Sequence, residues 1–141
     1  MIGWIVVDTN VLVSALLSSR EDSATVQVVA RMLAGDFIPV YSTAIMEEYR
    51  QVLHRAKFGF DPETVRYLLE AIEAFGVWVE PKASGRMLPD VKDLPFYEAV
   101  LEKRADDTCL VTGNLKHFPN EPFIVTPREL LAIMDGMRKQ E

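Results

Sequence analysis

Short apolar segments alternate with helical segments along the whole chain, and this alternation restricts the possible folds more than any other feature. The apolar segments span residues 2–7, 37–41, 77–79, 108–112 and 123–125. Helical periodicity or capping residues mark 11–17, 24–33, 43–55, 62–75, 94–103 and a last helix that opens at 126–129. Such alternation predicts a parallel sheet with helices on both faces. We therefore expect a three-layer α/β/α fold with a central, mainly parallel sheet of about five strands.

Length and composition favour one folded domain over residues 1–141. The chain is 49% hydrophobic and 26% charged, which is ordinary for a globular protein. Its single cysteine, Cys109, excludes an intramolecular disulfide, and the apolar surroundings predict a buried core thiol. The N-terminal apolar run meets Asp8 without a basic lead or a cleavage site, so we expect no signal peptide. No segment is long enough for a membrane span, and the expected location is the cytoplasm.

Local signals predict where several helices begin and end. Asp61-Pro62-Glu63 joins a capping acid to a proline at the first helical position. Thr126-Pro127-Arg128-Glu129 adds a capping box. Ser42 or Thr43 should cap the helix after residues 37–41, and Gly35 should end the helix before them.

The chain is acidic, with a net charge of −6 from 21 acidic and 15 basic side chains. A protein with this balance is not expected to bind DNA, RNA or anionic membranes through bulk charge. Any nucleic acid it meets must be held by metal ions and by a local basic edge.

Polar and acidic residues follow three of the predicted strands. Asp8 follows the first, Asp90 and Asp93 follow the third, and Thr112-Gly113-Asn114 closes the fourth. Ligands of open parallel sheets gather beyond the carboxyl ends of the strands, so these residues should meet at one edge. The simpler alternative is that Asp8 and Asp93 only cap helices and that Asn114 only forms a turn.

Glu48 falls on the apolar face of the predicted helix 43–55. It lies three residues after Ile45 and four before Val52, whereas Glu47 falls on the polar face. An inward carboxylate costs several kcal/mol unless it is paired or binds a metal. The alternatives are an ion pair with an arginine, or a side chain that reaches out to solvent.

Asp8, Glu48 and Asp93 could together form a carboxylate cluster at one sheet edge. Like charges held close together need a cation, and a ligand set made only of oxygen atoms selects Mg²⁺ or Mn²⁺ over zinc. Ions held in this way suit phosphoryl chemistry, because they activate water and stabilise developing charge.

Four segments resemble, in order, the motifs of PIN-domain ribonucleases, and the nearest resemblance is to PIN-family toxins of bacterial toxin–antitoxin systems. These segments are residues 6–16, which open with Val6-Val7-Asp8-Thr9-Asn10, residues 47–53 with Glu48 at the acidic position, residues 90–99 with Asp93 at the acidic position, and residues 110–114, Leu110-Val111-Thr112-Gly113-Asn114. The resemblance implies a metal-dependent endoribonuclease in which Asp8, Glu48 and Asp93 are the catalytic metal ligands. It also implies that the hydroxyls of Thr9 and Thr112 orient ligands or substrate. A small antitoxin and a homodimer are the partners that it implies.

One position departs from the family pattern, because Asn114 stands where the fourth motif usually ends in Asp. An asparagine is a weaker ligand for a hard cation, which leaves a second metal open. Either Asp90 supplies the missing charge, or the site holds one ion and Asn114 positions a water or a phosphate.

A basic segment near the end of the predicted helix 43–55 could bind RNA. The RNA-contact candidates are Arg50, His54, Arg55, Lys57 and, beyond Asn114, Lys116. Phe58 and Phe60 could stack on unpaired bases. The alternative is an ordinary solvated helix end with both phenylalanines in the core. His117 is interpreted as a loop histidine in preference to a general acid.

Two other functions stay open. Asn114 leaves room for an inactive PIN fold that only binds RNA or a partner protein. An aspartate-dependent phosphohydrolase would need a second acid two residues after Asp8, where Asn10 stands, and no matching lysine is evident.

For a homodimer, the apolar helices at residues 24–33 and 130–137 could supply a surface, although core packing explains them equally well.

Overall fold

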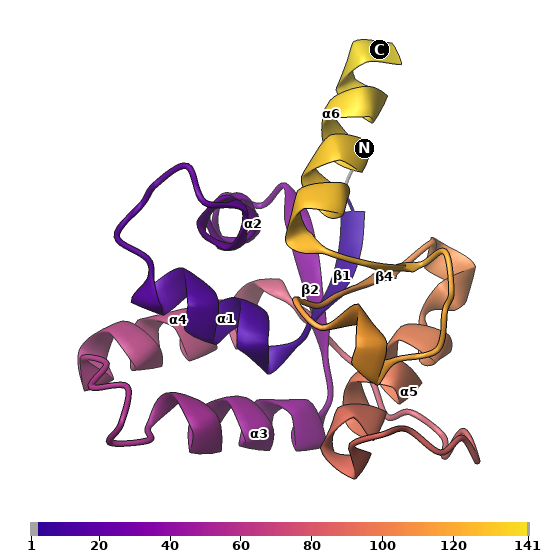
Figure 1. The fold of residues 1–141 in the computed structure, drawn as a ribbon, viewed down its shortest axis with the longest axis horizontal. Helices are drawn as coiled ribbons and strands as arrows, with labels where there is room; N and C mark the ends of the chain where they lie inside the picture. Colours follow the sequence, from indigo (N-terminus) through magenta and orange to yellow (C-terminus); the bar gives the residue numbers. More distant parts are fainter. Residues whose placement is uncertain (1–2, 141) are drawn as a thin grey trace.

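The central sheet has five parallel strands in the order β3-β2-β1-β4-β5, which confirms the predicted fold class (Figure 1). The computed structural model describes residues 3–140, and the side chains up to residue 136. Residue 2, predicted to open the first strand, lies outside this range. The strands are β1 (Gly3–Val7), β2 (Phe37–Tyr41), β3 (Val77–Trp78), β4 (Cys109–Val111) and β5 (Ile124–Val125).

Helices cover the sheet on both sides. They are α1 (Thr9–Leu17), α2 (Ala24–Leu33), α3 (Thr43–Leu53), α4 (Pro62–Phe75), α5 (Leu94–Glu102) and α6 (Pro127–Gln140), with short 3₁₀ turns η1 (Val91–Asp93), η2 (Arg104–Asp106) and η3 (Leu115–His117). Helix α5 packs across β1, β2 and β4 and contacts α3. Helix α2 packs on β2 and contacts α1 and α6. Within the described part of the chain, no helix has the length and hydropathy needed to cross a membrane.

The predicted helix caps are confirmed where local chemistry specified them. Asp61 accepts a hydrogen bond from the Glu63 amide at 3.2 Å. Ser42, and not Thr43, caps α3, because its hydroxyl accepts from the Ile45 amide at 3.2 Å. Thr126 and Glu129 form the reciprocal capping box, with bonds of 2.9 and 3.1 Å. Gly35 follows the end of α2 with a φ of +90°, a conformation that favours glycine.

Two expectations need correction. Helix α1 begins at Thr9 and not at residue 11, because Asp8 leaves β1 in an extended conformation and the helix starts at once. This places Thr9 in the first turn, next to the sheet edge. Cys109 is half-buried and not a fully buried core thiol, because it is the first residue of β4. Burial still raises the pKa of its thiol, so it is a poor nucleophile.

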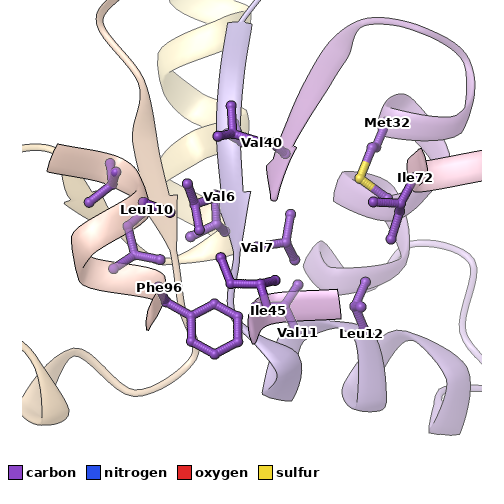
Figure 2. Close-up of a cluster of buried hydrophobic side chains, with 14 of the residues drawn as sticks. Val6, Val7, Val11, Leu12, Met32, Val40, Ile45, Ile72, Phe96 and Leu110 are labelled. Atoms are coloured by element: carbon purple, nitrogen blue, oxygen red, sulfur yellow. The ribbon is translucent and has the colours of Figure 1, made fainter. Parts of the chain in front are cut away.

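The hydrophobic core surrounds β1, the central strand. Val6 and Val7 are at most 1% exposed, and side chains from several helices pack around them. Figure 2 shows Val11 of α1, Ile45 of α3 and Phe96 of α5 close to the carboxyl end of β1. Close packing on all sides fixes the strand, and with it the residue that follows the strand, Asp8.

Candidate active site

The candidate site lies at the carboxyl edge of the sheet, between β1 and β4. The chain runs from β1 outward through β2 and β3, and then returns to β4 on the other side of β1. Such a reversal of strand order opens a crevice where ligands bind in α/β sheets. The amide of Asp8 donates to the carbonyl oxygen of Val111 at 2.9 Å, so the ends of the two strands are still paired at this point.

Asp8 is a buried carboxylate that does not serve as a helix cap. It occupies the capping position of α1, yet its side chain makes no capping hydrogen bond. Its Oδ2 accepts from the hydroxyl of Thr112 at 2.8 Å and from Nδ2 of Asn10 at 3.2 Å. Burial, assisted by the nearby charges of Asp93 and Glu48, raises the pKa of Asp8 to about 6, although the Thr112 bond opposes this shift.

Asn10, in the first turn of α1, joins the segments that follow β1 and β4. Its Nδ2 donates to Asp8, and its Oδ1 accepts from the Gly113 amide at 3.0 Å. The Thr112 hydroxyl in turn accepts from the Asn114 amide at 3.0 Å. Sequence reasoning missed this role of Asn10, because its partner Gly113 lies far away along the chain. Asp8 is therefore part of a hydrogen-bond network that joins the segments after β1 and β4.

Glu48 faces the same crevice from α3. It is half-buried, and Thr9 donates to its Oε2 at 2.8 Å, whereas Glu47 is exposed. The alternative of an ion pair with an arginine is not found among the described residues. The next residue, Tyr49, is buried and donates to the carbonyl oxygen of Val7 at 2.5 Å. Sequence reasoning missed Tyr49, which anchors α3 to the end of β1 and so sets the position of Glu48.

Asp93 enters from the opposite side, at the junction of η1 and α5. Its side chain makes no capping bond, and its Oδ2 lies 3.1 Å from Nδ1 of His117. In the neutral tautomer protonated at Nδ1, His117 donates to Asp93 and its Nε2 accepts from Nδ2 of Asn114 at 3.1 Å. Burial and the charge of Asp90 raise the pKa of Asp93, and His117 opposes the increase.

One open pocket of about 700 Å³ collects these groups. Its lining includes the three carboxylates Asp8, Glu48 and Asp93, together with Asp90, Asn114 and His117. Asp90 also caps η1, since its carboxylate accepts from the Lys92 amide at 2.9 Å. The structure thus brings all the proposed ligands to one cavity, although they come from segments far apart in the sequence.

The donor set fits a hard divalent cation in its chemistry. Neighbouring carboxylate charges contribute to the raised pKa values of Asp8 and Asp93, and a cation would relieve this repulsion. Oxygen ligands are the ones that Mg²⁺ and Mn²⁺ prefer. Among the residues that the structure describes, however, no three His, Cys, Asp or Glu side chains stand close enough to form a ready-made metal centre. Side-chain adjustment is therefore part of any metal binding here.

The basic candidates divide into two groups. Arg55 lines the pocket, and Lys57 lies in the adjoining loop. Arg50 instead forms an ion pair with Glu73 of α4 at 2.7 Å, and Nδ1 of His54 donates to the Arg50 carbonyl oxygen at 2.7 Å. Lys116 is exposed on η3 and is not part of the pocket lining.

Lys92 lines the pocket as well, although sequence reasoning did not select it. The signal was its place between Asp90 and Asp93, inside the segment that carries two pocket acids.

Comparison with known families gives the site its context. A family model described as PIN domain matches residues 4–116, which include every proposed carboxylate ligand. Searches of curated proteins and of solved structures found no match. PIN domains are generally nucleases and typically use divalent metals. The match covers most of the chain, and the chain therefore belongs to the PIN domain family.

Proposed function

We propose that this protein is a metal-dependent endoribonuclease, the toxin of a toxin–antitoxin pair, acting in the cytoplasm with Mg²⁺ or Mn²⁺. One observation carries the proposal: Asp8, Glu48 and Asp93 line a single pocket at the switch point of a nuclease-type fold. Uncharged hydroxyl groups donate to Asp8 and Glu48, and neither carboxylate forms an ion pair with the described residues. Both are therefore available to bind a cation.

The chain's own residues then have distinct roles. Asp8 would hold the ion from the buried end of the pocket, where Thr112 and Asn10 fix its orientation. Glu48, oriented by Thr9, would hold it from α3, and Asp93 from the start of α5. When bound, Mg²⁺ or Mn²⁺ would supply activation of water and stabilisation of charge on the phosphate. Arg55 and Lys92 at the pocket would attract the phosphate backbone.

The Asn114 side chain favours one ion over two. It lies in the pocket, where its Nδ2 donates to His117, and its Oδ1 is an uncharged oxygen that binds a hard cation less strongly than the usual aspartate would. Asp90 is the acid available for a second ion, because it lines the same pocket next to Asp93. Titration calorimetry with Mn²⁺ should therefore give about one ion per chain.

A non-catalytic PIN module is the second candidate. It is favoured by Asn114 and by the lack of a ready-made metal centre among the described residues. Such a module would bind RNA or a partner protein without cleaving either.

Partners are proposed from the family resemblance. A small antitoxin would bind this protein and inhibit its nuclease activity, and the protein itself would form a homodimer. Helices α2 and α6, considered for the dimer surface, contact one another within the chain, and Arg31 pairs with Asp135 at 3.2 Å between them. Val28, Met32, Leu130 and Met134 are buried, which leaves Ile133 as an exposed apolar residue of this pair of helices. The side chain of Met137 lies outside the described residues.

The deciding experiment is cleavage of end-labelled single-stranded and structured RNA by the purified protein. We expect cleavage with Mg²⁺ or Mn²⁺, none with EDTA, and none by Asp8→Asn or Asp93→Asn. Activity that survives EDTA, or either substitution, would contradict the mechanism. Binding without cleavage under every metal condition would favour the non-catalytic module. A short adjacent reading frame for a DNA-binding protein would support the toxin role.

A further inference from the structure

Two phenylalanines stack on one another in the loop between α3 and α4. The rings of Phe58 and Phe60 have centroids 5.3 Å apart and are inclined by only 11°. Gly59 lies between them with a φ of +63°, a left-handed conformation that a residue with a side chain adopts at a cost. This glycine allows the tight turn that brings the two rings together.

The two rings have different surroundings. Phe60 is half-buried and packs against the hydrophobic core. Phe58 is also half-buried, yet it packs on Phe60 and lines the candidate active-site pocket together with Leu17 and Arg55. Packing against the core therefore accounts for the partial burial of Phe60 but not for that of Phe58. Phe58 thus stacks on Phe60 and at the same time belongs to the lining of the pocket.

The cations beside Phe58 are free to act on a ligand. The Lys57 ammonium lies 5.1 Å from the centroid of the Phe58 ring. Neither Lys57 nor the Arg55 side chain forms an ion pair or a hydrogen bond with the described residues, whereas Arg50 and Arg66 are paired with glutamates. The aromatic ring and Arg55 thus line the acidic pocket where a phosphate would react, and Lys57 lies beside the ring.

We propose that Phe58, supported by Phe60 and flanked by Arg55 and Lys57, is a subsite that stacks an unpaired nucleobase next to the scissile phosphate. The inference rests on the proposed function and adds to it the position at which an unpaired base would bind. In a duplex both faces of each base are already stacked, so a ring on the protein can receive only a base that is unpaired. Aromatic stacking tolerates any base, while the cations bind the flanking phosphates.

The test is a binding measurement that does not depend on cleavage. A short single-stranded RNA carrying 2-aminopurine at successive positions is titrated with the full-length protein in Ca²⁺, with a gel to show that the RNA stays intact. We expect fluorescence quenching at one position, and Phe58→Ala should abolish this quenching and weaken binding about tenfold. Phe58→Trp should retain both. Removing the base at the quenched position should weaken wild type but not Phe58→Ala.

Two further variants keep the result interpretable. Phe58→Leu preserves apolar packing on Phe60 without an aromatic face, and it should lose the quenching while keeping the wild-type melting temperature. Phe75→Ala removes an exposed phenylalanine outside the pocket and should change nothing. The subsite is refuted if wild type binds no single-stranded RNA, if it prefers the duplex, or if Phe58→Ala binds like wild type. Dependence on Phe58 only for a partner protein would also refute it, and would assign the ring to a protein interface.

This design separates the two proposals. A protein that stacks the base but cleaves no RNA with Mg²⁺ or Mn²⁺ keeps the subsite and loses the nuclease. A protein that cleaves RNA with unchanged affinity in Phe58→Ala keeps the nuclease and loses the subsite.

Discussion

The two sides of the pocket hold their carboxylates in different ways. On the β1 side, Asp8 is 5% exposed and accepts hydrogen bonds from Thr112 and Asn10. Both partners are uncharged and belong to the hydrogen-bond network that joins the segments after β1 and β4. On the α5 side, Asp93 is less buried, follows the long loop of residues 80–90, and has the ionisable His117 as its partner. In the proposed metal site, the β1 side would be a fixed side that determines where a cation binds, and the α5 side an adjustable side that completes its coordination. Four predictions test this difference, from the largest expected effect to the smallest.

Removing the charge of Asp8 should have the largest effect. We expect Asp8→Asn to weaken Mn²⁺ binding by more than about 100-fold, because even partners outside the coordination shell of a metal cost about 10–100-fold. Calorimetry measures this directly. Asp135→Asn, which alters an acid on α6 away from the pocket, is the control and should bind Mn²⁺ like wild type. Unchanged affinity in Asp8→Asn would show that the fixed side does not hold the ion.

The buried Asp8 should also make metal-free stability depend on pH. Its pKa is about 6 in the folded protein against 3.8 in the unfolded chain, so between these values the native state holds a proton that the unfolded state releases. The contribution of Asp8 to stability is therefore full below pH 4 and falls as the pH rises through 6, by an amount on the order of 3 kcal/mol. Urea unfolding in EDTA from pH 4 to 8 measures this slope.

The matched variant for this pH series is again Asp8→Asn. It should flatten the slope and make the metal-free protein more stable than wild type at pH 7, while saturating Mg²⁺ should stabilise wild type only. An unchanged or steeper slope in Asp8→Asn would contradict the assignment.

Thr112 should matter for the site more than for the fold. Thr112→Val removes the hydrogen bond that orients Asp8. We expect a 10–100-fold loss of activity. The free energy of unfolding should fall by about 1–3 kcal/mol. Thr108→Val is the matched control, because Thr108 is equally buried and donates to the Lys103 carbonyl oxygen at 2.8 Å, at the other end of β4. The control should lose similar stability and keep its activity. Equal loss of activity in both would reduce the role of Thr112 to packing.

Changing the partner of Asp93 should have the smallest effect. His117→Ala frees an oxygen of Asp93 on the adjustable side, so we expect less than about a tenfold change in Mn²⁺ affinity and little change in melting temperature. Calorimetry and thermal unfolding of this variant measure both. An effect as large as that of Asp8→Asn would show that the two sides are equally fixed.

The sequence predicted the fold well, because strand and helix periods, caps and turns depend on neighbours in the chain. The boundaries of α2, β2 and α4 match the prediction. The same helical period placed Glu48 inward and Glu47 outward, and the structure agrees. The roles of Asp8, Glu48 and Asp93 as metal ligands stay predictions. The ends of β3, β4 and β5 differ by one residue from the predicted segments 77–79, 108–112 and 123–125, since short strands carry little pattern.

The partners in the site could not be predicted in this way. Thr112 and Asp8 are 104 residues apart, and Asn10 and Gly113 are 103 apart. Arg50 and Arg55 looked alike as RNA contacts, yet Arg50 reaches Glu73 of α4 while Arg55 lines the pocket. Phe58 and Phe60 likewise looked alike in the sequence and have different surroundings in the fold.

The sequence by itself therefore determined which elements form and which acids follow the strands, because these properties are local. Only the tertiary structure decided which hydroxyl holds which carboxylate, which cations stay unpaired, and which ring faces the pocket. The physical reason is that hydrogen bonds and ion pairs act over a few ångströms. Their partners are chosen by the sheet order β2-β1-β4 and by the packing of α3 and α5 beside it, which no neighbour in the chain encodes.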